Sequence, residues 1–231
     1  MSEIYAFGDS VLKGVIIENE KYKVCKNRFS NICEEVLNVV IANKAKFGST
    51  ISIGEKSFQR NIDMLDNPNV EYVVLEFGGN DCDFKWQEIS DNPDIEHSPN
   101  IEINEFIKMY TDIIQMIKSK NKRPVLLSLP PIDSQRYMNK LSKNLNKENI
   151  LKWMNNNIYF LTNWHERYNI EVFKLAINNN ISIIDITSKF LEQKDYSCFL
   201  CEDGIHPNER GHKLISEAIQ EHISRKKIKF N

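Results

Sequence analysis

Five short apolar segments of the chain have the composition of buried β-strands. They are rich in Val, Ile, Leu and Phe, and they lack the strict alternation of apolar and polar residues that marks a half-exposed strand. Strands covered on both faces, as in a parallel sheet between two layers of helices, have this composition. The expected strands are Ile4–Phe7, Asn38–Ala42, Glu71–Phe77, Val125–Leu129 and Ile181–Ile186.

Helical patterns lie between and after these strands. In Glu102–Lys120, apolar residues recur at spacings of three and four, which places them on one side of a helix. Asn121 and Pro124 follow where that helix should end, and Glu209–Ile223 repeats the apolar pattern near the C-terminus. Alternating strands and helices predict right-handed βαβ units, and hence an α/β fold with a doubly wound parallel sheet.

One connection, residues 131–180, is too long for a simple crossover between the fourth and fifth strands. It is expected to form two or three helices, broken around residues 155–157, and to pack mainly as core. Such an excursion near a sheet edge can also shape a substrate pocket. Because no internal repeat or disordered linker is visible, residues 1–231 are expected to form a single domain.

Composition and charge narrow the classes of partner. The chain is 41% apolar and 27% charged, which is ordinary for a globular protein with a real core. The net charge of −2 comes from interleaved lysines and acids, so nothing favours a nucleic-acid or anionic-membrane partner. No apolar run approaches the roughly 20 residues of a membrane span, and the N-terminus lacks a secretory signal pattern. A cytoplasmic protein is therefore expected, and the sequence does not indicate its oligomeric state.

The cysteines fit a reduced environment. Their number, five, is odd, and a chain of this size does not need disulfides for stability. Cys198 and Cys201 form a C-x-x-C motif, but a structural zinc site would need a second pair of ligands at similar spacing. Structural or incidental thiols are favoured over metal or redox roles. Neither a G-x-G-x-x-G nor a P-loop motif occurs, so no metal and no cofactor are expected.

Polar residues follow the expected strands where a parallel sheet collects its ligands, at the carboxyl ends of the strands. These residues supply a hydroxyl, a backbone N–H beside a glycine, a side-chain amide, a carboxylate and an imidazole, which are the groups that acyl transfer requires. Three stretches, Gly8–Ser10, Phe47–Thr50 and Gly78–Asp81, follow the first three expected strands, and the fourth, Glu202–Pro207, lies late in the chain just before the last expected helix.

The chemistry of acyl transfer assigns a role to each group. Ser10 would be the nucleophile, His206 the base that takes its proton, and Asp203 the carboxylate that orients the imidazole. The backbone N–H groups of Ser10 and Gly48 and the side-chain amide of Asn80 would stabilise the oxyanion.

Two other acidic residues, Asp185 and Asp81, are candidates for supporting roles. Asp185, at the end of the fifth expected strand, is the alternative partner of the histidine. Asp81 is expected to order the loop that carries Asn80 rather than to react. The remaining histidines have weaker signals: His165-Glu166 is half of an H-E-x-x-H motif whose second histidine is missing. His97 and His222 are expected to be surface or packing residues, and His212, further along the last helix, is expected to point away from the site.

The motifs Phe7-Gly8-Asp9-Ser10, Gly48, Gly78-x-Asn80-Asp81 and Asp203-x-x-His206-Pro207 resemble the four sequence blocks of the SGNH hydrolases, also called GDSL-type esterases and lipases. They occur in the family's order, over residues 6–212. The one departure is Val11, where the family's short name has leucine. The resemblance implies a flavodoxin-like three-layer α/β/α sandwich with about five parallel strands, and the same roles for Ser10, Asp203 and His206, with Gly48 and Asn80 completing the oxyanion hole.

The expected function is a serine esterase that cleaves short-chain or acetyl esters of small molecules through an acyl-enzyme on Ser10. Aromatic residues near Asn80 and in the excursion are expected to contact substrate, on a sugar face or along an acyl chain. These are Phe84, Trp86, Trp153 and Trp164. A thioesterase or lysophospholipase of the same family, and a catalytically silent binding module on the same fold, remain alternatives. The lack of a phosphate-binding loop disfavours a nucleotide or flavin binder.

Overall fold

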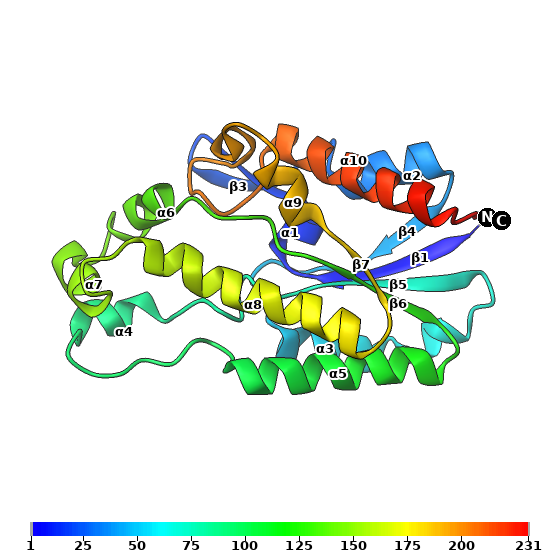
Figure 1. The fold of residues 1–231 in the computed structure, drawn as a ribbon, viewed down its shortest axis with the longest axis horizontal. Helices are drawn as coiled ribbons and strands as arrows, with labels where there is room; N and C mark the ends of the chain where they lie inside the picture. Colours follow the sequence, from blue (N-terminus) through cyan, green and yellow to red (C-terminus); the bar gives the residue numbers. More distant parts are fainter. Residues whose placement is uncertain (1, 231) are drawn as a thin grey trace.

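The computed structural model describes residues 2–230, and its centre is a five-stranded parallel sheet. The strand order is β4-β1-β5-β6-β7, and every pairing between neighbours is parallel (Figure 1). This is the flavodoxin-like order, in which the first strand lies between the second and the third of the sheet. The expected α/β fold is confirmed. The strands are β1 (Glu3–Gly8), β4 (Val40–Asn43), β5 (Val70–Glu76), β6 (Arg123–Leu127) and β7 (Ser182–Ile184).

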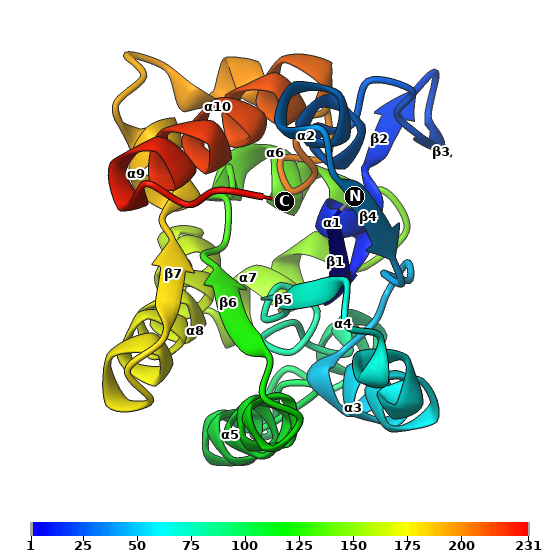
Figure 2. The same cartoon turned by 90° about the vertical axis from the view of Figure 1, so that its right-hand side faces the viewer.

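Helices cover both faces of this sheet, as Figure 2 shows. One layer contains α2 (Phe29–Leu37), α9 (Ile186–Leu191) and α10 (Glu209–Lys226). The other contains α3 (Ile51–Arg60), α5 (Ile103–Ser119) and α8 (Tyr159–Asn178). Each layer encloses its own apolar cluster against the sheet, which explains why the strands are apolar on both faces.

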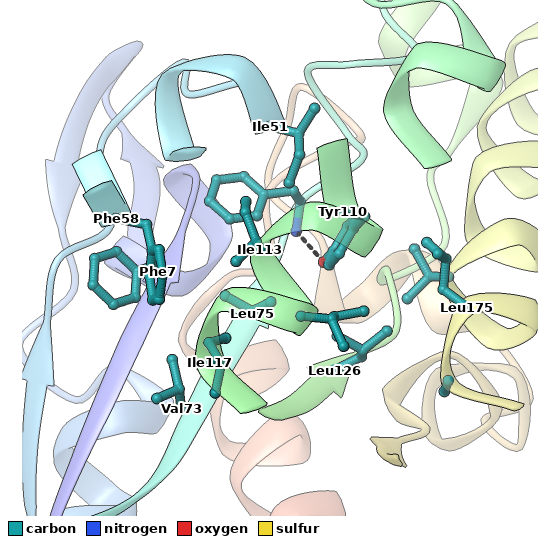
Figure 3. Packing of buried hydrophobic residues seen from close by; sticks show 14 of the residues in the cluster. Phe7, Ile51, Phe58, Val73, Leu75, Tyr110, Ile113, Ile117, Leu126 and Leu175 are labelled. Carbon is teal, nitrogen blue, oxygen red and sulfur yellow. Dashed lines mark hydrogen bonds between the residues drawn. The ribbon is translucent and has the colours of Figure 1, made fainter. Parts of the chain in front are cut away.

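The cluster under α3 and α5 also anchors the end of β5 (Figure 3). Phe7 and Phe58 pack edge to face with ring centroids 5.3 Å apart. The buried hydroxyl of Tyr110 accepts a hydrogen bond from the backbone N–H of Phe77 at 3.2 Å. Core packing therefore holds the chain at the point where it leaves β5 for the loop Gly78–Asp81.

Shorter elements gather beyond the carboxyl ends of the strands, at the end of the molecule opposite the termini (Figure 1). The long excursion forms three helices, and Asn155 and Asn156, both with left-handed φ angles, break the chain between the second and third, as expected. The elements at this end are α1 (Ser10–Lys13), α4 (Trp86–Asp91), α6 (Ser134–Leu141), α7 (Lys147–Trp153) and a hairpin of β2 (Val15–Glu18) and β3 (Lys21–Val24). Two short 3-10 helices, η1 (Ile62–Asp66) and η2 (Tyr196–Phe199), complete the fold.

The antiparallel hairpin was not expected from the sequence. Its turn uses Asn19 and Glu20, both with positive φ, instead of the Asn-Gly pair that marks such a turn. All four residues of β3 are exposed, so the strand lacks the apolar signal of a buried one. Within residues 2–230, no helix has the length and apolarity needed to cross a membrane.

His212 is buried on the inner face of α10 without a hydrogen bond. Its ring stacks on Phe29 of α2 with centroids 5.7 Å apart, and neither ring nitrogen has a partner among the described residues. Burial lowers the pKa of His212 from 6.5 to about 4, because the charged imidazolium would lose its hydration. The folded protein therefore keeps this imidazole neutral at pH values where the unfolded chain protonates it.

This burial predicts a loss of stability in mild acid. Below about pH 6.5 the unfolded chain binds a proton that the folded protein rejects, so the free energy of unfolding falls until the pH reaches about 4. The loss from this group amounts to about 3 kcal/mol. Urea unfolding of the wild type and His212→Leu at pH 7.5 and 4.5 measures it. The variant should lose less stability on acidification, and an equal loss in both proteins would contradict the account.

Candidate active site

The structure brings Ser10, His206 and Asp203 into one hydrogen-bonded chain. Ser10 starts α1 directly after β1, and His206 lies in the loop before α10. The Nε2 atom of His206 is 2.8 Å from the Oγ atom of Ser10, and its Nδ1 atom is 2.6 Å from Oδ2 of Asp203. All three side chains are buried. With the proton on Nδ1, Nε2 is free to accept the hydroxyl proton of Ser10.

The loop that carries the acid and the base is held by its own backbone. Oδ1 of Asp203 accepts the N–H groups of Ile205 and His206 at 3.1 and 3.2 Å. Gly204 has a left-handed φ of 73°, and a Cβ atom there would lie 2.6 Å from the carbonyl oxygen of Asp133. These constraints aim the carboxylate at the imidazole. The alternative partner, Asp185, instead accepts the N–H of Ser188 and caps α9, so it does not serve His206.

Burial and hydrogen bonding act in opposite directions on Asp203. Burial alone would raise its pKa, but the hydrogen bond and charge of His206 and the two backbone N–H groups outweigh it. The pKa of Asp203 therefore lies below its usual value, and the group is an anion at neutral pH. An anion here stabilises the imidazolium that forms when His206 takes a proton.

Ser10 is positioned by the tight passage from β1 into α1. A Cβ atom on Gly8 would lie 2.6 Å from the carbonyl oxygen of Glu76, so only glycine permits this approach of β1 to β5. Asp9 then caps α1, because its Oδ1 accepts the N–H of Val11 at 2.8 Å. Ser10 is the first residue of α1, where backbone N–H groups have no partner inside the helix.

The amide of Asn80 faces the same region with its nitrogen. Nδ2 of Asn80 donates to Oδ2 of Asp9 at 2.8 Å and makes a longer contact of 3.4 Å with the carbonyl oxygen of Ser49. The first bond determines which end of the amide faces the site. The second is weak enough for that N–H to turn to a stronger acceptor.

The loop of Asn80 is anchored from behind by Asp81, as the sequence suggested. Oδ1 of Asp81 accepts the N–H of Ile51 at 2.7 Å, which ties the loop to the start of α3. Burial raises the pKa of Asp81 to about 8. The third expected oxyanion donor, Gly48, is placed differently: it is exposed, with a φ of 67°, and it does not line the cavity beside Ser10. Its neighbour Phe47 lines the cavity instead.

Ser10, Asn80 and His206 open into a cavity of about 270 Å³ with aromatic walls. Three of the four aromatic residues expected at the substrate pocket line it: Phe84, Trp86 and Trp164. The expectation for Trp153 is not met: it does not line the cavity, and its ring packs against that of Phe84, with ring centroids 4.9 Å apart. The excursion contributes to the walls through α6 and α8.

Comparison with known protein families decides the assignment. The family described as GDSL-like lipase/acylhydrolase matches residues 4–219. The chain belongs to this family. It is therefore a carboxylic ester hydrolase whose substrates are small-molecule esters. A search of curated proteins finds no match.

Solved structures of GDSL hydrolases have the same fold. A lipase/acylhydrolase from Enterococcus faecalis aligns over 98% of this chain and 97% of its own, with 19% identity and a TM-score of 0.69. A member of the lipolytic G-D-S-L family from Veillonella parvula DSM 2008 aligns over 97% and 100%, with 19% identity and a TM-score of 0.64. A catalytic mutant of Axe2, an acetylxylan esterase from Geobacillus stearothermophilus, aligns over 96% of this chain and 94% of its own, with 15% identity and a TM-score of 0.67.

Two aromatic residues of this GDSL hydrolase flank the base and were not expected there. The ring of Phe47 lies parallel to that of His206 at 6.2 Å, and Tyr22 packs edge-on at 5.6 Å. The hydroxyl of Tyr22 accepts a hydrogen bond from Nζ of Lys140 at 2.6 Å. Tyr22 belongs to the unpredicted hairpin, so only the folded structure reveals its place at the mouth of the cavity.

Polar groups also line the cavity among its aromatic walls. Oδ1 of Asp83 accepts the indole N–H of Trp86 at 2.7 Å and the hydroxyl of Tyr137 at 2.6 Å. Burial raises the pKa of Asp83. The ring of His165 also lines the cavity, and its Nδ1 atom is buried 3.7 Å from Oε1 of Glu166, too far for a hydrogen bond. In the sequence, the acidic and aromatic residues that closely follow Asn80 are the signal from which this polar wall could have been predicted.

The cysteines are all free thiols. Cys198 is exposed, whereas Cys201 is buried, and its sulfur accepts a hydrogen bond from the N–H of Ile17 at 3.3 Å. Across residues 2–230, no cluster of three or more His, Cys, Asp and Glu side chains is arranged to bind a metal ion.

Proposed function

We propose that this GDSL hydrolase is a serine esterase that cleaves short acyl esters through an acyl-enzyme on Ser10. The observation that carries the proposal is the chain of two short hydrogen bonds from Ser10 through His206 to Asp203 at the wall of a cavity. A serine hydroxyl is a weak nucleophile until a base takes its proton, and here the base is already within bonding distance.

The reaction would proceed in two steps. Oγ of Ser10 attacks the ester carbonyl carbon while Nε2 of His206 takes the hydroxyl proton. The tetrahedral oxyanion accepts hydrogen bonds from the backbone N–H of Ser10 and the side-chain N–H of Asn80. The C–O bond to the alcohol then breaks, and His206 returns the proton to the leaving oxygen. Water then attacks the acyl carbon while Nε2 of His206 takes one of its protons. The bond between the acyl carbon and Oγ breaks, the acid leaves, and His206 returns the proton to Oγ of Ser10.

The size and polarity of the cavity favour a small, hydroxylated ester. Its volume of about 270 Å³ lies below the usual range of sites for drug-sized ligands. A long acyl chain would bury Asp83 and His165 against hydrocarbon without new hydrogen bonds, which is costly. A sugar ring could stack on the aromatic walls while its hydroxyls bond to Asp83, whose Oδ2 has remaining acceptor capacity. The structurally similar Axe2 is an acetylxylan esterase, and we propose acetylated sugars as the substrate class.

Replacement of the nucleophile tests the reaction. Ser10→Ala should lower kcat for p-nitrophenyl acetate by about 10⁴-fold or more, because no other group can form the acyl-enzyme. A fluorophosphonate probe should label the wild type stoichiometrically and leave the variant unlabelled. Ser30→Ala is the matched control, since Ser30 is a buried serine in α2 whose hydroxyl lacks a partner in the described structure. Wild-type turnover and labelling in Ser10→Ala would end the proposal.

Replacement of Asp83 tests the substrate class. Asp83→Asn keeps an oxygen that can accept from Trp86 and Tyr137 but removes the charge. It should lower kcat/KM for acetylated xylose by about 10- to 100-fold, the value of a hydrogen bond to a charged group, and change hydrolysis of p-nitrophenyl acetate by less than about threefold. Asp94→Asn, at an exposed ion pair with Lys152, is the control. Equal effects on the two esters would count against sugar recognition by Asp83.

A further inference from the structure

A buried acid that contacts the helix of the nucleophile, α1, has no part in the reaction described above. Glu76 is the last residue of β5, it is 1% exposed, and it reaches the wall of the active-site cavity. Its Oε2 atom is 3.4 Å from the N–H of Asp9 and 3.3 Å from that of Leu12. Its Oε1 atom is buried without a hydrogen-bond donor among the described residues. A charged carboxylate would be poorly stabilised in this position.

The carboxyl group of Glu76 lies beside that of Asp9, which is buried as well, so the two charges act on each other, and a proton on one group would let the pair form a hydrogen bond. Two carboxyl groups can bond to each other only when one of them holds a proton. Two adjacent buried carboxylates would also repel each other strongly, as in other carboxyl dyads. The pair therefore carries one proton at neutral pH.

The remaining contacts decide which member holds that proton. Both oxygens of Asp9 accept short hydrogen bonds, Oδ1 from the N–H of Val11 and Oδ2 from the amide of Asn80, each at 2.8 Å. These donors stabilise a negative charge on Asp9. Glu76 has only the two long contacts with backbone N–H groups, and so it is the acid of the pair.

We propose that Glu76 is a positioning residue that stays protonated, donates its proton in a hydrogen bond to Asp9, and thereby keeps the amide nitrogen of Asn80 turned toward the oxyanion. This inference rests on the proposed function of Asn80 as an oxyanion donor. An ionised Asp9 accepts only, so it selects the N–H end of the amide. A protonated Asp9 would donate a hydrogen bond instead. It would favour the flipped amide, in which Oδ1 of Asn80 faces Asp9 and Nδ2 is no longer held by it.

The proposal has a consequence for pH dependence. Burial, followed by the charge of Asp9, raises the pKa of Glu76 well above its ordinary value. In alkaline solution Glu76 would lose its proton, the two carboxylates would repel each other, and the support of Asn80 would fail. Four other titratable groups lie around the pair: Asp81 and Cys82 after β5, Tyr110 on α5, and His206 before α10.

Two substitutions test whether Glu76 acts as a hydrogen-bond donor or only fills space. In Glu76→Gln, the amide N–H can donate to Asp9 and the amide oxygen can accept from Leu12, but the group does not ionise. In Glu76→Leu, the donor is lost and the volume is largely kept. Because Asp81, Cys82, Tyr110 and His206 are present in all three proteins, their titrations cancel when the profiles are compared.

The experiment is a set of pH profiles of kcat and KM for p-nitrophenyl acetate from pH 6 to 10, with folding checked by thermal unfolding. At pH 7.5, Glu76→Leu should lower kcat by about 10²-fold with KM nearly unchanged, as expected for loss of an oxyanion donor. Glu76→Gln should lose less than about tenfold, and its kcat should decline less than that of the wild type at alkaline pH.

Either of two results would overturn the inference. One is a loss in Glu76→Gln as large as in Glu76→Leu, in proteins that remain folded. The other is an alkaline profile of Glu76→Gln identical to that of the wild type. Fluorophosphonate labelling of the wild type distinguishes this outcome from failure of the proposed function. If Ser10 is not labelled, the acyl-enzyme itself is refuted, and not only the role of Glu76.

Discussion

The 2.8 Å contact between the hydroxyl of Ser10 and the imidazole of His206 is the interaction on which the account depends. The two residues are 196 positions apart in the chain, and only the parallel sheet brings them together. β1 lies between β4 and β5, so its carboxyl end delivers Ser10 to the centre of the edge where polar loops converge. The tight approach at Gly8 and the anchoring of β5 by Tyr110 then fix the two loops that carry the nucleophile and the amide of Asn80.

Much of the fold could be predicted because its three central strands, β1, β5 and β6, are mostly buried, and continuous apolar runs mark such strands clearly. The errors occur where that signal is weak. β4 begins at Val40, two residues later than expected, because Asn38 adopts a left-handed φ of 54° at the end of α2 while Val39 and Val40 look like strand residues. The β2–β3 hairpin was missed because β3 is exposed and its turn lacks glycine. The candidate reactive residues were proposed for a different reason: acyl transfer requires particular groups. The sequence places Ser10 and Asn80 just after strands, and Asp203 and His206 just before the last helix.

The surroundings of the reactive residues depend on tertiary contacts that no local pattern contains. Trp153 and Trp164 are both aromatic residues of the excursion, yet only Trp164 lines the cavity. Gly48 stands in the expected stretch, but its loop presents Phe47 to the cavity instead. Glu76 had a sequence signal that was not used: an acid near the end of the otherwise apolar segment Glu71–Phe77 must be buried and therefore paired or protonated. Its relation to Asp9 became visible only when β1 and β5 were placed side by side.

The most direct test of the central claim is a crystal structure of the protein after reaction with a fluorophosphonate. The account predicts a covalent bond between phosphorus and Oγ of Ser10. It also predicts that the phosphoryl oxygen lies about 2.7–3.1 Å from the backbone nitrogen of Ser10 and from Nδ2 of Asn80, with Asn80 still bonded to Asp9. A phosphorus atom on another residue, or a phosphoryl oxygen that contacts neither donor, would contradict the account.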